Sequence, residues 1–248
     1  MSRWKAAGIH LSISLAIGLV IGALLFGVWY PPPYFHAAGA DVLVVLLVSV
    51  DLTLGPLLTL IVFKSGKKGL KFDLSLIGFV QAVALVYGLS VVLESRPVFL
   101  VAAVDRFTLV SANDIDAKDL DEGGKPEFRS LSWTGPRIVG VALPTGKDRN
   151  DLVFSSINGG KDVDKLPKYY VDYTTTAPEL LARAKPIDAL KIADPAERDL
   201  LADAIRKTGE TQDQLVWVPL MARKANLVML LDRKTGNMVR AVGVNPWK

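Results

Sequence analysis

The chain has 248 residues, two His and no Cys, and half of its residues are hydrophobic. The absence of Cys excludes disulfides, iron–sulfur clusters, thiolate zinc sites and a Cys nucleophile. The isoelectric point near 9.2 would suit a nucleic-acid partner, yet residues 97–248 hold 22 Lys/Arg against 21 Asp/Glu. The basic excess belongs to residues 1–96, with 7 against 4. Because the charge of the C-terminal part is balanced, we expect no nucleic-acid partner. Because the chain has no Cys and only two His, we also expect no metal and no cofactor.

Three apolar runs of 21, 22 and 20 residues stand at about residues 9–29, 42–63 and 74–93. At about 1.5 Å per residue, each run reaches roughly 30 Å, the thickness of the hydrocarbon layer of a bilayer. The runs predict a three-helix transmembrane domain over residues 1–95.

Lys and Arg in the short flanks predict the orientation of these helices. Arg3 and Lys5 precede the first run, four Lys lie between the second and third, and residues 30–41 hold neither Lys nor Arg. The positive-inside rule then places the N-terminus in the cytoplasm and the chain after Glu94 outside it, which in a bacterium is the periplasm. A cleaved signal peptide is the competing interpretation, but the first run is long for one and small residues follow it only about ten positions later.

Residues 96–248 predict a periplasmic α+β domain with a mostly antiparallel sheet. Helix starts are expected at Thr176 and Asp194 from capping patterns, with a stop at Gly209. The acidic, Gly-containing stretch 114–125 predicts a loop. Alternating apolar stretches predict strands at Pro97–Val104, Arg137–Leu143, Gln214–Leu220, Asn226–Leu231 and Met238–Val244, the last two joined by a hairpin.

Asp51, near the middle of the second run, is the most unusual residue of the chain. An ionised carboxylate there costs about 3 kcal/mol on insertion scales, so Asp51 should face protein rather than lipid. Gly55 and Thr59 follow at i+4 and i+8 on the same helix face. Gln81 of the third run lies at a similar depth. Either Asp51 and Gln81 bond each other within a three-helix bundle, or this stripe receives a helix of another protein.

A second stripe of small and polar residues follows one face of the first run. His10, Ser14, Gly18 and Gly22 recur at i+4 spacing, and the two Gly form a GxxxG pattern. Small residues let helices approach closely in a membrane. Packing against the other two runs and binding of a partner helix both remain open for Ser14, Gly18 and Gly22.

The sequence offers no catalytic constellation. Asp41 and Asp51 are ten residues apart on one helix, about 15 Å, whereas an aspartyl dyad shares a proton across about 3 Å. Asp73 fits the N-cap of the third helix better than a catalytic role. No His follows His36, so a Ser–His pair cannot form in the C-terminal domain. We therefore expect a protein that is not an enzyme.

Several segments resemble the type IV pilin accessory proteins, the TfpX/TfpZ family. This resemblance implies a bacterial inner-membrane protein that is not itself a pilin but supports a cognate type IV pilin. It supplies no active-site residues. The similar segments are MSRWKAAGIHL at the N-terminus, DLTLGPLLTLIVF (Asp51–Phe63), KFD (Lys71–Asp73), RPVFLVAAVDRF (Arg96–Phe107), GPRIVGVALP (Gly135–Pro144), PKYYVDY (Pro167–Tyr173) and the stretch from Asp232 to Trp247.

The expected function is that of a chaperone-like accessory factor that binds the membrane helix of the pilin, and its periplasmic head, before or during pilus assembly. A pilin-binding regulator of turnover or signalling is the alternative. An enzyme that modifies the envelope is disfavoured because no catalytic constellation is present.

Overall fold

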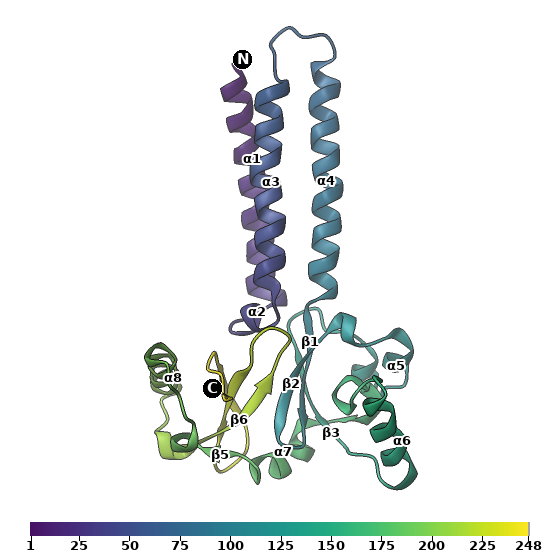
Figure 1. Ribbon diagram of the computed structural model, residues 1–248, viewed down its shortest axis with the longest axis vertical. Coiled ribbons are helices and arrows are strands. Elements are labelled where there is room, and N and C mark those ends of the chain that lie inside the picture. Colours follow the sequence, from purple (N-terminus) through teal and green to yellow (C-terminus); the bar gives the residue numbers. More distant parts are fainter. Residues whose placement is uncertain (248) are drawn as a thin grey trace.

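The computed structural model describes residues 1–247 and has three long apolar helices standing on a domain built around one sheet (Figure 1). The helices are α1 (Arg3–Leu24), which continues into the π-helical turn η1 (Leu25–Trp29), α3 (Ala40–Val62) and α4 (Leu70–Glu94). By length and composition all three can cross a membrane. The prediction of three long apolar helices is confirmed; the helices start a few residues before the apolar runs and end within one residue of them.

The middle position among the long helices belongs to α3, because α1 and α4 both pack against it. The short helix α2 (Tyr34–Ala37) lies in the connection between η1 and α3, beside the sheet domain, and the Lys-rich loop is at the opposite end of the helices (Figure 1). The predicted N-cap at Asp73 is wrong. Helix α4 begins after Gly69, whose φ of 83° favours glycine, and Asp73 lies in the first turn, 2.6 Å from Lys67 Nζ.

The sheet has eight strands and is mixed, but five of its seven strand pairs are antiparallel, so most of the pairing is antiparallel as the sequence predicted. The order is β4-β3-β1-β2-β6-β7-β8, with β5 paired to β6. Two pairs, β1 with β3 and β2 with β6, are parallel. The strands are β1 (Pro97–Ala103), β2 (Arg106–Ser111), β3 (Arg137–Val141), β4 (Tyr170–Val171), β5 (Lys185–Pro186), β6 (Leu215–Met221), β7 (Leu227–Asp232) and β8 (Met238–Val242).

The unpredicted strand β2 explains the parallel pairs. A tight turn at Val104 and Asp105 sends the chain straight back beside β1 as an antiparallel hairpin. Long connections precede both β3 and β6. Parallel neighbours require such long crossovers, and β3 then pairs with β1 while β6 pairs with β2. The hairpin β1–β2 therefore occupies the centre of the sheet, with one parallel neighbour on each side.

The helices of the sheet domain agree in part with the capping patterns. Helix α8 (Pro195–Thr208) begins at Asp194, whose carboxylate accepts from the N–H of Ala196, and ends at Gly209 with φ 76°, as predicted. The other helices are α5 (Ala117–Asp121), α6 (Gly146–Ile157) and α7 (Tyr173–Leu181), with 3-10 turns η2 (Ala112–Asp114), η3 (Pro126–Arg129), η4 (Val163–Lys165), η5 (Pro167–Tyr169), η6 (Ile187–Ala189) and η7 (Gln212–Gln214).

Two of the local predictions are wrong. Helix α7 begins after Asp172, so Thr176 lies inside the helix and not at its start. Its first turn is held by the Tyr173 hydroxyl, which donates to the carbonyl of Gly236 at 2.5 Å, a contact outside the reach of a local pattern. The stretch 114–125 includes the short helix α5 and is not a continuous loop.

One apolar cluster joins the long helices to the sheet. It combines buried residues from the ends of α1 and α4 with one face of the central strands. The opposite face carries two separate clusters, one under α5 and η3 and the other under α8. The junction is therefore packed, because the helix ends and the sheet are buried against each other. The members that make this link include Leu25, Trp29, Tyr30, Val92, Leu100, Phe107 and Val218.

Candidate functional site

Asp51 and Gln81 meet between α3 and α4. The amide Nε2 of Gln81 donates to Asp51 Oδ1 at 3.0 Å and lies 3.4 Å from the Asp51 carbonyl oxygen. Gly55 provides the space for this contact, since a Cβ there would lie 2.0 Å from Gln81 Nε2. Among the described side chains, Asp51 takes part in no ion pair. Asp51 therefore faces another helix of its own chain, and its hydrogen-bond donor is an uncharged amide.

A groove of about 310 Å³ opens beside this contact. One turn or two from Asp51 and Gln81 toward the sheet domain, Leu47 packs against Gly88, where a Cβ would lie 2.3 Å from Leu47 Cδ1. The Oε1 atom of Gln81 is buried and has no hydrogen-bond partner in the part of the chain whose side chains the structure describes. The groove thus combines apolar walls with one unsatisfied acceptor. Its lining residues are Leu43, Leu47, Val50, Asp51, Gln81, Ala84, Leu85, Tyr87, Gly88 and Val91.

The four residues of the α1 stripe do not share one surface. Ser14, 3 % exposed, and Gly18 line a narrow crevice that also touches Asp51. A Cβ on Gly18 or Gly22 would meet no atom within 4 Å, so neither glycine serves a close helix contact within the chain. Gly22 is not among the described lining residues of the groove or the crevice.

Thr59 is paired elsewhere, with His10 of α1. Thr59 is 3 % exposed, and its Oγ1 lies 2.6 Å from His10 Nδ1. The bond ties α1 to α3 toward the end that carries the Lys-rich loop. The sequence placed both residues on polar stripes, but it did not pair them. Of the seven predicted residues, Asp51, Gly55 and Gln81 form one contact, Ser14 and Gly18 border it, and Thr59 and Gly22 lie apart from it.

Polar groups that the sequence did not single out fasten the helices to the sheet domain. The buried Tyr30 hydroxyl donates to the Val92 carbonyl at 2.7 Å, and burial raises the pKa of Tyr30 far above its usual value. Lys224, in the β6–β7 turn, lies 2.6 Å from Asp41 Oδ2, and that carboxylate also bonds His36. Asp41 and Asp51 therefore have separate partners and form no dyad.

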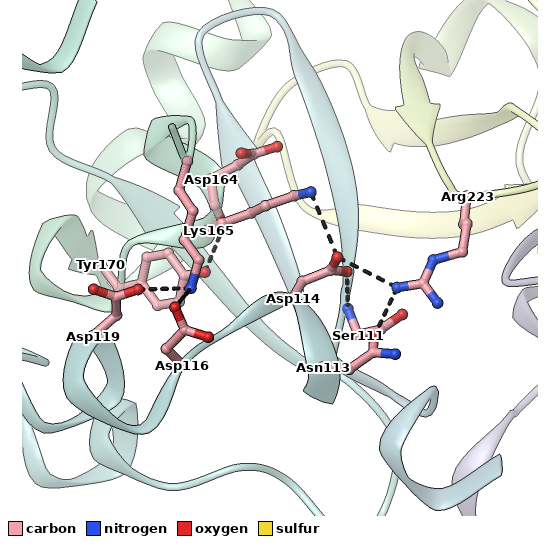
Figure 2. Close-up of polar contacts among 10 residues, drawn as sticks. Ser111, Asn113, Asp114, Asp116, Asp119, Asp164, Lys165, Tyr170 and Arg223 are labelled. Atoms are coloured by element: carbon pink, nitrogen blue, oxygen red, sulfur yellow. Dashed lines mark hydrogen bonds and ion pairs between the residues drawn. The ribbon is translucent and has the colours of Figure 1, made fainter. Parts of the chain in front are cut away.

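A second polar region lies in the sheet domain around Asp114 (Figure 2). Its carboxylate accepts from the N–H of Ser111 at 2.9 Å and pairs with Arg223 at 3.3 Å and Lys165 at 3.5 Å. These contacts join η2, the β6–β7 turn and η4 beside an open cleft of about 640 Å³. At the same cleft, burial raises the pKa of Asp164, and its Oδ1 has no partner within the described residues.

A second cleft of the sheet domain is lined by Asp116, Asp119 and Lys161, and the chemistry available at both clefts is limited. Lys161 Nζ lies 2.8 Å from Asp116 and 2.7 Å from Asp119, the two carboxylates that Figure 2 labels. Among the side chains that the structure describes, no group of three His, Asp or Glu could hold a metal ion. Both His lie on or beside the long helices. Apart from Asp164, the acidic side chains described above form ion pairs or cap backbone N–H groups, and these contacts organise loops.

These features define a class of protein with three membrane-length apolar helices fastened to a small mixed-sheet domain. The fimbrial assembly proteins of Dichelobacter nodosus are similar to it in sequence. That of serogroup I is 30% identical over 250 residues, covering 98% of this chain and 96% of the relative, and that of serogroup E1 is 28% identical over 249 residues, with the same coverage. The protein of serogroups C1 and C2 is 37% identical over 121 residues, 48% of this chain and 92% of the relative.

The family described as fimbrial assembly protein FimB matches residues 1–39. No solved structure matches the chain. The full-length similarity shows that the chain belongs to the fimbrial assembly protein family, and the resemblance to type IV pilin accessory proteins is confirmed.

Proposed function

We propose that this protein is an inner-membrane accessory factor that binds a cognate type IV pilin, in the manner of a chaperone, and supports its stability or its assembly into pili. The names of its full-length relatives support a role in fimbrial assembly. In this proposal the protein acts by binding, without catalysis, because the described residues present an assembled groove and no catalytic constellation.

The proposed topology has the N-terminus and the Lys-rich loop in the cytoplasm and the sheet domain in the periplasm. The three helices have the required length and apolar composition. Basic residues cluster at the end of the helices away from the sheet domain, and the positive-inside rule assigns that end to the cytoplasm. The sheet domain then stands where the head of a membrane-held pilin also stands.

The groove between α3 and α4 is the proposed site for the pilin helix, and the unpartnered Oε1 of Gln81 is the observation that supports it most directly. An acceptor without a donor is costly in an apolar medium. Because Oε1 is buried in the chain by itself, a donor on a helix entering the groove would satisfy this acceptor only once the Gln81 amide turns toward the groove. Apolar walls would contribute van der Waals contact, as helix association in lipid requires.

The α1 stripe extends the same binding surface. Ser14 and Gly18 border the crevice at Asp51, and the open space over Gly18 leaves room for a side chain of the incoming helix. Gly55 acts indirectly by letting Gln81 reach Asp51. Gly22 would contact the partner only at the end of such a helix, and Thr59, which is buried against His10, would support the surface from within the chain. Interhelical polar bonds in membranes are worth about 0.6 kcal/mol on average, so a complex of this kind can release its subunit.

Asp51→Leu tests this site. It removes the acceptor beside Gln81 and makes α3 more apolar, so insertion should persist while co-purification of pilin falls several-fold. Thr53→Leu is the matched control, since Thr53 is an exposed polar residue on the same helix at nearly the same depth and does not line the groove. Unchanged pilin co-purification and normal piliation with Asp51→Leu would remove this residue from the proposed site.

Pilin half-life in a deletion strain separates the proposed role from the alternative. Rapid loss of pilin fits a chaperone-like role, and stable pilin with few fibres fits a role in assembly. A change in pilin transcription alone would favour a regulator. Photocrosslinkers at position 18 and at the exposed groove positions 50 and 84 would show whether pilin contacts the membrane helices without disturbing the contact of Gly55 with Gln81.

A further inference from the structure

One loop of the sheet domain, residues 130–136, lies against the ends of two long helices. Arg96, two residues beyond α4, donates from Nη1 to the Leu93 carbonyl at 2.7 Å and from Nε to the Ser132 carbonyl at 3.0 Å. At the other side of the loop, a Cβ on Gly135 would lie 3.3 Å from the Pro31 ring and 3.8 Å from the Val28 carbonyl oxygen. The loop therefore touches the end of α4 and the end of η1.

Trp133, within this loop, points its indole away from the protein core. It is 61 % exposed, whereas Arg96 beneath it is 5 % exposed. The Arg96 guanidinium lies 4.6 Å from the ring centroid, in cation–π contact. The side chain is thus held in place by a buried residue while most of its surface is uncovered. By contrast, Trp29 and Tyr30 at the same junction are buried in the protein.

The length of α4 sets the height of the loop relative to a bilayer. Its 25 residues span about 37 Å at about 1.5 Å per residue. That length exceeds the roughly 30 Å hydrocarbon layer but not the roughly 40–45 Å of a bilayer with its headgroup regions. The end of α4 therefore falls within a headgroup layer, and the loop bonded to that end through Arg96 falls there too.

We propose that the loop of residues 130–136 is a membrane-binding element, with Trp133 inserted among the lipid headgroups as its anchor. Indole side chains concentrate at this depth because their rings are apolar and their N–H groups are polar. The partner is the lipid interface itself. Together with the helix ends, this contact holds the sheet domain against the bilayer at a fixed tilt. The inference rests on the membrane insertion proposed above and does not depend on pilin.

Because the chain has no Cys, one introduced cysteine gives a single labelling site. A nitroxide at Thr134→Cys leaves Trp133 in place. The full chain is reconstituted in vesicles of phosphatidylethanolamine and phosphatidylglycerol, and the ratio of the accessibility of oxygen to that of a water-soluble nickel complex reports depth. Val83→Cys, exposed near the middle of α4, is the control for the bilayer core, and Leu200→Cys, exposed on α8, is the control for water.

The Thr134 ratio should lie between those of the two controls. Adding Trp133→Ser should shift it toward the Leu200 value, while Trp133→Tyr, which keeps an interfacial aromatic ring, should leave it in place. An unchanged ratio in Trp133→Ser would mean that Arg96 alone holds the loop at this depth, and it would overturn the anchoring role of Trp133. A Thr134 ratio equal to either control in the otherwise native chain would overturn the proposal. If the Val83 ratio equals the Leu200 ratio, the helices are not inserted, and the proposed membrane topology fails together with this inference.

Discussion

Arg96 is the residue whose replacement should most clearly separate the helices from the sheet domain. In Arg96→Met, the carbonyl oxygens of Leu93 and Ser132 lose their donors, at 2.7 and 3.0 Å. Hydrogen bonds from a charged group contribute about 1.5–3 kcal/mol each, but returning a guanidinium to water recovers part of that sum. We expect the free energy of unfolding of the sheet domain to fall by about 2–4 kcal/mol.

The assay is denaturant unfolding of the full chain in lipid nanodiscs, with hydrogen exchange over residues 130–136 as the local readout. Exchange in this loop should rise because Arg96 no longer holds it. Arg96→Lys should lose most of the same stability, since an ammonium group does not reproduce the fork of a guanidinium. Arg106→Met is the matched control, because Arg106 pairs with Asp105 at a half-exposed turn and should contribute less than about 1 kcal/mol. Equal losses for Arg96→Met and Arg106→Met would refute the reasoning.

Three further predictions concern the sheet domain and its junction. Gly140→Ala places a Cβ 2.1 Å from Thr176 Oγ1, so thermal unfolding should show a loss of about 1–3 kcal/mol that Thr176→Ala partly restores; no loss would mean that α7 does not lie on β3 here. Burial raises the pKa of Asp164, so the folded chain retains a proton that the unfolded chain loses at about pH 3.9. Stability should therefore fall as pH rises from that value through the folded pKa, and this fall should disappear in Asp164→Asn; parallel pH profiles would contradict it. Lys224→Met removes the ion pair with Asp41 and should lower the free energy of unfolding by at most about 1 kcal/mol. Added salt should reduce this difference, and a difference that does not change with salt would count against the ion pair.

The local patterns of the chain were sufficient for many individual elements. Apolar runs of bilayer length predicted α1, α3 and α4, because the solvation of each segment depends on its own composition. Alternation predicted β1, β3, β6, β7 and β8, and the cap at Asp194 predicted the start of α8. The strand β2 was missed because it follows β1 after a two-residue turn that has no Gly, at Val104 and Asp105.

The polar residues of the long helices show where the sequence alone was insufficient. Depth along a helix follows from counting residues, so Asp51 and Gln81 were expected at similar heights, and they do meet. The rotation of each helix about its axis does not follow from counting. It decides that Thr59 faces His10 and that Gly22 is outside the crevice which Gly18 borders.

The sequence by itself determined which segments are apolar, where they begin and end within a few residues, and which end of the helices carries the positive charge. These properties are local, because they depend on the residues of one segment and their solvation. Only the tertiary structure decided that the sheet is mixed, that Gly55 makes room for Gln81, and that Arg96 joins α4 to the loop of Trp133. Each of these depends on a contact between segments distant in the chain, which crossovers, helix rotation and burial set together.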